Sequence, residues 1–121
     1  MSSQLKDAPF ALSGAPTESE LLSKYFRVLG DDTRLTIIDL LAEGEQSVGA
    51  LVEALGVPQP QVSNHLACLR WCGFVNTRRE HRRVYYRVAD ERVVELTTLA
   101  RALLRDNEEH VATCATVAGG R

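Results

Sequence analysis

The amino-acid sequence predicts one mainly α domain of the α+β class with a single β-hairpin, and three observations predict this class. Apolar residues recur at helical spacing in five segments, which capping residues or glycines bound. The stretch over residues 74–89 is instead rich in valine, tyrosine and arginine, which is typical of two short strands. With 121 residues, of which 45% are hydrophobic, the chain can bury a core without disulfides or metal.

The first half of the chain predicts an arm and three helices. Residues 1–16 hold Ser, Gly, Pro and Ala without periodicity, so we expect a flexible N-terminal arm. Residues 18–29 have the apolar spacing of an amphipathic helix. In the next segment, DDTRLTIIDLLAEG, Asp31 or Asp32 can cap a second helix. Ser47 can cap a short third helix, and a glycine follows each of the three helices.

The second half predicts a fourth helix and a hairpin. Pro58 and Pro60 stand where prolines are tolerated, in the first turn of a helix that runs to about Trp71. The core-facing residues of this helix are Val62, Leu66 and Leu69. After the helix, the segments FVNTRRE and RRVYYRVA, separated by about His81 and Arg82, have the composition of paired strands.

A long last helix, capped by Asp90, completes the domain. The predicted order is helix-helix-helix-helix-strand-strand-helix. A short Gly-Val-Pro turn joins the third and fourth helices, so this pair matches a helix-turn-helix and the arginine-rich hairpin matches a wing. We therefore divide the chain into an arm (1–16), a winged helix-turn-helix domain (17–105) and a C-terminal tail (106–121).

The charge of the chain is segregated. The 14 Lys and Arg residues against 16 Asp and Glu residues give a net charge of -2. Between residues 75 and 87, however, five arginines stand against one acid, Glu80, which leaves +4 (5 minus 1) in this stretch. Local rather than total charge builds a surface that attracts phosphate. We predict that the hairpin contacts nucleic acid; the alternative is a hairpin that is merely solvated.

Polar side chains at the start of the fourth helix can read bases. Gln and Asn pair bidentately with adenine in the major groove, and Ser bonds base edges or phosphate. A solvated helix face is the alternative, but the turn, the polar helix start and the basic hairpin together favour double-stranded DNA. The predicted DNA-binding residues are Gln59, Gln61, Ser63, Asn64, His65, Arg70, Arg78, Arg79, Arg82 and Arg83.

Three cysteines form a candidate metal site. Cys68 and Cys72 lie on one face of the fourth helix about one turn apart, close enough for two thiolates to bind one ion. Cys114, in the tail, could supply a third thiolate. Three thiolates favour soft, large ions such as Cd(II) and Pb(II), and Zn(II) is a weaker candidate because it normally takes a fourth ligand. The alternative is that these free cysteines are only small hydrophobic residues.

Four stretches of the sequence resemble the ArsR/SmtB family of bacterial metal-responsive repressors. They are LGDDTRLTIIDLL, VGALVEALGVPQPQVSNHLACLR, GFVNTRRE and VYYRVAD. The resemblance implies a homodimer built on the first and last helices, an operator of inverted half-sites, and repression that an inducer relieves.

The metal ligands distinguish branches of that family. The Cys-Val-Cys of its arsenic- and cadmium-sensing members is absent from GEQSVGALVEALG, and Arg92 stands where the zinc, nickel and cobalt sensors carry a histidine after Asp90. HLACLRWCGFV together with Cys114 is instead similar to the actinobacterial cadmium/lead sensor branch, the CmtR type. There, two cysteines on the recognition helix and one in the C-terminal tail bind the ion. The resemblance leaves open whether Cys114 comes from the same or the partner subunit.

The sequence thus predicts a metal-sensing transcriptional repressor that releases its operator when Cd(II) or Pb(II) binds the cysteine thiolates. We expect it in the cytoplasm, because no secretory signal and no apolar run of membrane-spanning length is present. A thiol-based redox or persulfide switch on the same fold is the alternative, and a protein-interaction module is another. A thiol enzyme using Cys68 and His65 lacks an oxyanion-hole turn and an orienting acid, so we do not expect an enzyme.

Overall fold

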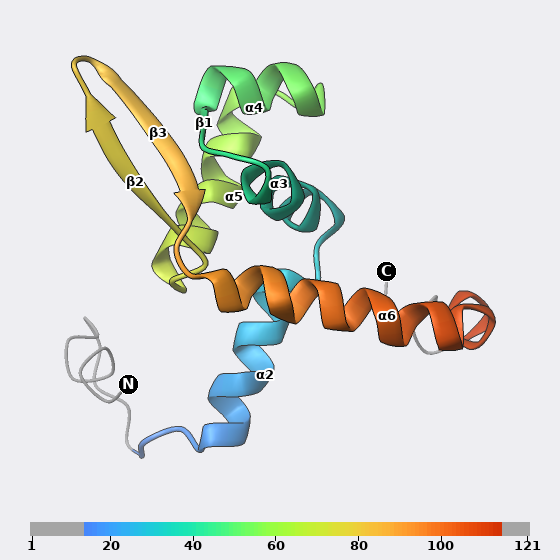
Figure 1. Ribbon diagram of the computed structural model, residues 1–121. Helices are drawn as coiled ribbons and strands as arrows, with labels where there is room; N and C mark the ends of the chain where they lie inside the picture. Colours follow the sequence, from blue (N-terminus) through green and yellow to red (C-terminus); the bar gives the residue numbers. More distant parts are fainter. Residues whose placement is uncertain (1–13, 115–121) are drawn as a thin grey trace.

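The computed structural model describes residues 14–114, which form five α-helices and a three-stranded sheet (Figure 1). The first 13 residues of the predicted arm and the last seven of the predicted tail lie outside the described residues. The elements, in chain order, are α2 Glu18–Leu29, α3 Asp32–Ala42, β1 Gln46–Ser47, α4 Val48–Leu55, α5 Gln59–Trp71, β2 Val75–Glu80, β3 Arg83–Val88 and α6 Glu91–Thr113.

Side-chain caps start α3, α4 and α6 where the sequence predicts them. The backbone N–H of Arg34 donates to Asp31 at 3.0 Å, so Asp31 rather than Asp32 caps α3. Ser47 accepts from the N–H of Ala50 at 3.1 Å, and Asp90 caps α6 in the same way. Each cap satisfies an N–H that the first helical turn leaves without a partner.

The core lies beneath α5 and is closed by the chain reversal that follows it. Val62, Leu66 and Leu69 are each 0% exposed, as the helical spacing predicts. Gly73 then adopts a left-handed conformation (φ 85°), which lets the N–H of Phe74 donate to the carbonyl of Leu69 at 2.9 Å. The remaining members of the buried cluster are Leu29, Ile37, Ile38, Leu41, Leu51, Phe74, Val75 and Val93. Since one face of α5 is buried in this way, its other faces are directed to solvent.

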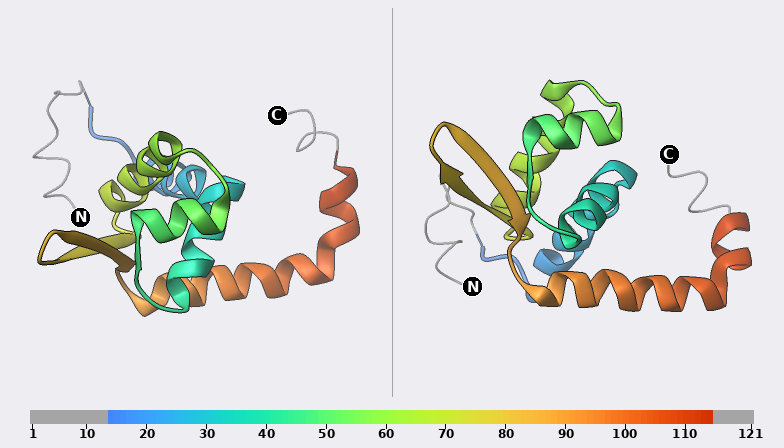
Figure 2. Two further views of the ribbon diagram at one scale, coloured as in Figure 1. Left: turned by 90° about the horizontal axis from the view of Figure 1, so that it is seen from above. Right: turned by 45° about the horizontal axis from the view of Figure 1, so that its top comes forward.

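The wing contains one strand more than the hairpin that the sequence predicts. The strand order is β1-β3-β2, and both pairings are antiparallel. β1 has two residues, Gln46 and Ser47, which pair with Tyr86 and Tyr85. Two residues are too few to show a periodic pattern, so the sequence could not predict this strand. It is defined only by its pairing with β3. Since Ser47 also caps α4, β1 connects the wing directly to the start of the helix-turn-helix (Figure 2).

Helix α6 is longer than the sequence predicts. It continues through residues 106–113, which the sequence assigns to the tail, and it ends at Thr113. Asn107 has non-helical backbone angles (φ -128°, ψ 17°), and its amide donates to the carbonyl of Leu103 at 3.0 Å. The last turns therefore leave the axis of the first part at an angle (Figure 2). A polar composition hid this extension, because exposed Glu108 and Glu109 are compatible with a solvated helix.

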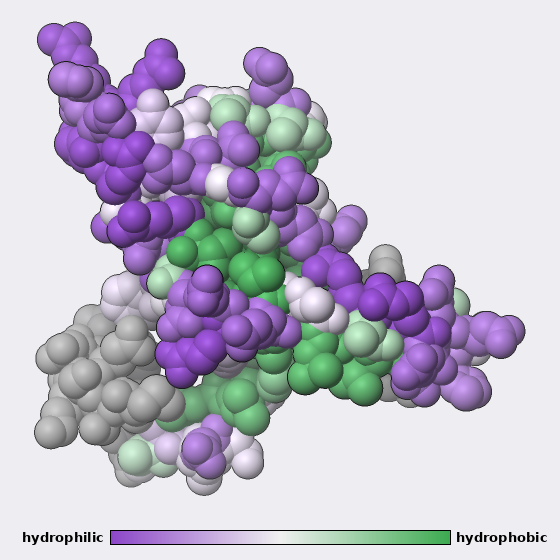
Figure 3. Space-filling model, in the orientation of Figure 1, coloured by the Kyte–Doolittle hydropathy of each residue, from purple (hydrophilic) through white to green (hydrophobic). Residues whose placement is uncertain are grey.

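Helices α2 and α6 carry apolar side chains that the chain does not bury. Figure 3 shows hydrophobic surface over both helices, and Leu99 is the most exposed of these residues on α6, at 61%. The set consists of Leu22, Phe26, Leu99, Leu103, Leu104 and Val111. Exposed apolar side chains gathered on two helices of a small domain favour a contact with another molecule. Within residues 14–114, no helix combines the length and the apolar character that crossing a membrane requires.

The cap at Ser47 leads to a first prediction. Replacing Ser47 by alanine is expected to lower the free energy of unfolding by about 1 kcal/mol, because the N–H of Ala50 loses its acceptor. The matched control is Ser63→Ala on the exposed face of α5, expected to change stability by less than about 0.5 kcal/mol. Urea denaturation followed by circular dichroism measures both, and equal losses would show that Ser47 is no cap.

Candidate nucleic-acid interface and thiol site

The start of α5 presents the predicted base-reading side chains to solvent. Gln59, Gln61, Ser63 and Asn64 are all exposed, because Val62 and Leu66 occupy the buried face between them. Pro58 precedes the helix, which begins without a side-chain cap. Pro58 and Pro60 carry no N–H, and the N–H of Gln61 donates to the carbonyl of Pro58 at 3.0 Å. The positive end of the helix dipole and the polar side chains, rather than free N–H groups, therefore favour contact with DNA phosphate and bases here.

His65 has a structural role that the sequence did not indicate. Its Nδ1 accepts a hydrogen bond of 3.0 Å from Nε of Arg34, and the same guanidinium donates to the carbonyl of Val28 at 3.2 Å. Asp31, the cap of α3, lies 4.0 Å from Nδ1. Arg34 of α3 thus links His65 on α5 with the end of α2. A DNA contact by His65 stays a prediction, and Arg70, near the other end of α5, is exposed.

The predicted wing arginines differ in their availability. Arg79, Arg82 and Arg83 are exposed at the far end of the hairpin. Arg78, one residue earlier, is bound within the chain by two carboxylates, those of Glu45 and Glu80. With Glu45 included, the basic stretch faces two acids, so its local charge is +3 (5 minus 2) rather than the predicted +4.

The ion pair of Arg78 and Glu45 shifts the pKa values of its two members in opposite directions. Hydrogen bonds to Glu45 and then to Glu80 raise the pKa of Arg78 above its usual range. The hydrogen bonds that Glu45 accepts from the Arg78 guanidinium lower the pKa of the Glu45 carboxyl. Both groups are therefore charged over the whole physiological range, and the wing is anchored to the connection between α3 and β1 by an ion pair.

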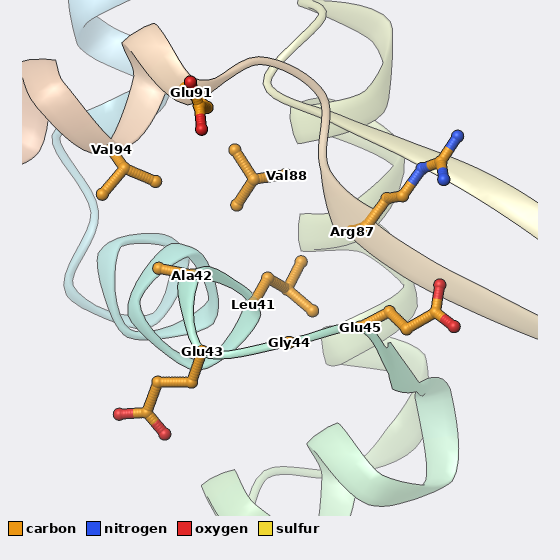
Figure 4. A pocket seen from close by; sticks show the side chains of 9 residues that line it. All are labelled: Leu41, Ala42, Glu43, Gly44, Glu45, Arg87, Val88, Glu91 and Val94. Atoms are coloured by element: carbon orange, nitrogen blue, oxygen red, sulfur yellow. The ribbon is translucent and has the colours of Figure 1, made fainter.

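Glu45 also borders a shallow hollow between α3, β3 and α6 (Figure 4). Leu41, Val88 and Val94 supply apolar side chains to this hollow. Figure 4 shows that Glu45 points from the hollow toward the wing, whereas Glu43 points in the opposite direction. Two glutamates that are only two positions apart in the sequence therefore face different parts of the molecule.

Cys68 and Cys72 lie one helical turn apart at the end of α5, in different surroundings. Cys68 is exposed, whereas Cys72 is half-buried against the core. Burial raises the pKa of the Cys72 thiol, and the adjacent Cys68 raises it further, while Lys24 and Arg34 act in the opposite direction. At neutral pH Cys72 is consequently a protonated thiol, which an incoming metal ion must deprotonate.

Cys114 lies at the other end of the molecule from these two thiols. It is the C-cap residue of α6, and its N–H donates to the carbonyl of Val111 at 3.3 Å. The 23 residues of α6 correspond to roughly 35 Å of helix path. Figures 1 and 2 both draw the end of α6 well away from α5. Over residues 14–114, no three His, Cys, Asp or Glu side chains gather into a metal-binding cluster, so a single protomer does not bring the three predicted ligands together.

Two of the contacts above were missed by the sequence analysis. Arg34 is 31 residues from His65, and Glu45 is 33 residues from Arg78. Both pairs join segments that only the folded chain brings together, and no local periodicity or motif signals them. A charge count over the wing alone finds the arginines but overlooks a carboxylate supplied from outside it.

Comparison with known proteins agrees with this geometry. The sequence profile described as "Bacterial regulatory protein, arsR family" matches residues 31–77. A probable mercury resistance operon repressor of Streptomyces lividans is 39% identical over 103 residues, which are 85% of this chain and 82% of that protein. The HTH-type transcriptional regulator CmtR of Mycobacterium bovis is 43% identical over 82 residues, which are 68% of this chain and 64% of that protein.

A solved structure shares the arrangement over most of the chain. A homodimeric winged helix-turn-helix DNA-binding domain of Mycobacterium bovis superposes with a TM-score of 0.69 and 34% identity, over 82% of this chain and 95% of that one. The predicted winged helix-turn-helix fold is thereby confirmed, with α4 and α5 as its two helices and the sheet as its wing. The matched proteins regulate transcription, which also confirms that the chain is not an enzyme.

The unequal surroundings of the two thiols on α5 predict unequal reactivity. Iodoacetamide is expected to modify Cys68 before Cys72 at pH 7, because only the thiolate reacts and Cys72 is both half-buried and raised in pKa. The rate at Cys72 should climb as the pH rises toward its elevated pKa, beyond the range in which an ordinary cysteine peptide levels off.

Peptide mass spectrometry at a series of pH values measures the two rates, and a Cys72→Ser variant isolates the rate of Cys68. Equal modification of both thiols at pH 7, or a Cys72 rate that follows the ordinary peptide, would contradict the burial of Cys72.

Proposed function

Because this chain belongs to the ArsR family of bacterial regulatory proteins, we propose that it is a metal-sensing transcriptional repressor. It binds operator DNA in the metal-free state and releases it when a soft heavy-metal ion binds its cysteines. The observation that carries the proposal is the position of Cys68 and Cys72 on α5, the same helix that presents Gln59, Gln61, Ser63 and Asn64 to solvent. An ion bound at one end of this helix acts directly on the element that reads DNA at the other.

In the proposed complex, α5 lies in the major groove and the wing lies on the flanking backbone. The exposed Gln and Asn side chains near the start of α5 have the donors and acceptors for adenine, and Ser63 can bond a base edge or a phosphate. Arg79, Arg82 and Arg83 supply phosphate contacts that position the protein without reading sequence.

We propose further that two copies assemble through α2 and α6. The apolar side chains that these helices leave exposed, among them Phe26 and Leu99, need a partner surface (Figure 3). The similar M. bovis domain is homodimeric. A two-fold dimer of this fold reads an operator of inverted half-sites about 34–36 Å apart, one turn of DNA.

The dimer also supplies the third thiolate in this proposal. Cys114 of one protomer cannot reach its own α5 along the path of α6, so we assign the third ligand to Cys114 of the partner subunit. Three thiolates suit a soft ion that accepts low coordination, such as Cd(II) or Pb(II), better than Zn(II). The S. lividans relative is named as a probable mercury resistance operon repressor, and mercury is likewise a soft metal that thiolates bind.

The proposed mechanism is competition for the position of α5. Thiols with a pKa near or above about 8.5 are mostly protonated at neutral pH, so the ion displaces protons as it binds. Once bound, it ties the end of α5 to the partner's tail and moves the two reading helices relative to each other. A coupling free energy of about 1–3 kcal/mol weakens DNA binding by about 5- to 150-fold.

The redox alternative is less favoured by the geometry. Cys68 lies in the last turn of α5 and Cys72 is the C-cap residue about one turn further on, an arrangement that suits a disulfide poorly. Reversible oxidation of these thiols to a disulfide would require α5 to unwind at its end.

Serine substitutions test the metal proposal. Cys68→Ser and Cys72→Ser are expected to leave metal-free operator binding unchanged but to abolish release by Cd(II) or Pb(II), because the ion loses a thiolate on α5. Cys114→Ser is expected to weaken release. Electrophoretic shifts of the chain's own promoter region, titrated with a panel of metal ions, measure these effects with Mg(II) as the control.

Reciprocity gives the same proposal a second measurement. Since coupling between two sites acts in both directions, operator DNA must weaken metal binding by the factor by which metal weakens DNA binding. Metal affinities that are equal with and without operator would refute the coupling, as would release that persists in the serine variants.

The wing arginines give a separate prediction. Arg79→Ala and Arg83→Ala are expected to lower affinity for operator and random DNA alike, and to reduce the slope of log K against log salt by about 0.9 for each lost phosphate contact. The control is Arg101→Ala, which removes the same charge from α6, where Arg101 bonds Asp39 at 2.7 Å. Unchanged affinity and slope in the wing variants would contradict the placement of the wing on DNA.

A further inference from the structure

One arginine of the wing, Arg78, is bound by two of the protein's own acids. Nε of Arg78 donates to the two carboxylate oxygens of Glu45 at 2.9 and 2.8 Å, and its Nη2 donates to Glu45 as well. Its Nη1 donates to Glu80 at 2.8 Å. The guanidinium carbon lies 5.0 Å from the centre of the Tyr85 ring, so the aromatic side chain covers one face. All three guanidinium nitrogens thus have partners within the chain.

We propose that Glu45 restrains the DNA affinity of the wing by competing with DNA phosphate for Arg78. This inference rests on the DNA-binding part of the proposed function and adds to it a residue that lies outside both α5 and the hairpin. A carboxylate that grips the guanidinium fork in two places occupies the donors that a phosphate would use. The wing therefore binds DNA more weakly than its five arginines alone would allow.

The location of Glu45 supports competition rather than simple burial of an ion pair. The side chains of Arg78 and Glu45 are 39% and 31% exposed, so solvent, and hence a phosphate, can reach the guanidinium. Glu45 belongs to the connection between α3 and β1, whereas Glu80 lies on the strand of Arg78 itself and makes a single bond. Glu45 is thus the partner that makes the two-point contact.

A limit on the DNA affinity of the wing suits a repressor that must dissociate from its operator. Phosphate contacts act on every sequence, so each additional one strengthens the residual binding of the metal-bound state as much as that of the repressing state. With release limited to a factor of about 5 to 150, a wing that bound phosphate too tightly would keep the protein on DNA after induction. Withholding one arginine leaves affinity dependent on the base-reading residues of α5.

The chain offers a matched pair of variants. Glu45→Gln removes the charge but keeps an oxygen that can accept from Arg78, so the wing stays positioned while its competitor is lost. Glu43→Gln makes the same charge change two residues away, on a side chain that points in the opposite direction (Figure 4). Circular dichroism melting checks that each variant is folded, and Glu45→Ala is the second variant if Glu45→Gln is unstable.

The experiment measures the affinity of the full-length, metal-free protein for a random-sequence duplex over a series of salt concentrations. Glu45→Gln is expected to bind about fivefold more tightly near 0.15 M salt, and its slope of log K against log salt should steepen by about 0.9, the contribution of one phosphate contact. Glu43→Gln should match the unsubstituted protein. In an Arg78→Ala background, Glu45→Gln should leave the slope unchanged, because no guanidinium remains to be released.

Three results would overturn the restraint: unchanged or weaker binding by Glu45→Gln, an equal gain in Glu43→Gln, or a gain that persists without Arg78. The last two would assign the effect to net charge. Release of operator by metal is measured separately on the unsubstituted protein, so metal sensing can fail while the restraint holds, and the restraint can fail while metal sensing holds. Failure of every variant to bind any duplex would overturn both.

Discussion

The burial of one face of α5 is the constraint on which the rest of this structure depends. Val62, Leu66 and Leu69 are fully enclosed, and the left-handed turn at Gly73 returns the chain immediately into β2. A helix held along one face cannot rotate without breaking those contacts, so the side chains on its other faces have fixed directions. Its polar start and its thiol-bearing end consequently move together. Two ligands that bind the ends of such a helix influence each other even though they never touch.

The positive charge of the chain is concentrated locally, on the wing. The chain carries a net charge of -2, yet the far end of the hairpin displays exposed Arg79, Arg82 and Arg83. Nearer the body of the molecule, carboxylates occupy Arg78, and Asn76 bonds Arg87 at 2.8 Å. The basic surface is therefore graded along the wing, with available arginines at the tip and engaged ones at the base. Since exposed charges are screened over about a Debye length, this local gradient decides where a phosphate backbone can settle.

The sequence predicted much of what local chemistry determines, although not the capping box of Thr17 and Glu20 that starts α2. The caps at Ser47 and Asp90, the two strands of the hairpin and the inward face of α5 follow from residue type and spacing. For α3 the sequence left two candidates, and the structure shows that Asp31 rather than Asp32 is the cap. What escaped it depends on contacts between distant segments: the strand β1, which exists only against β3, and the bonds from Arg34 to His65 and from Arg78 to Glu45. The sequence did not predict the extension of α6 past Asn107, because a solvated helix has no apolar stripe that would indicate it.

The length of α6 has a consequence for how a signal can be sensed. In the proposed dimer, the helix that provides an apolar contact surface also carries Cys114 away from its own α5. A three-thiolate site can then be complete only when two protomers are assembled, so an ion that binds it stabilises one arrangement of the dimer over others. DNA likewise selects the arrangement that spaces two copies of α5 one turn apart. In this proposal ion and operator thus compete through the geometry of the dimer, and the kink at Asn107 lies between Leu104 and Cys114, where a change of angle alters the position of the thiol.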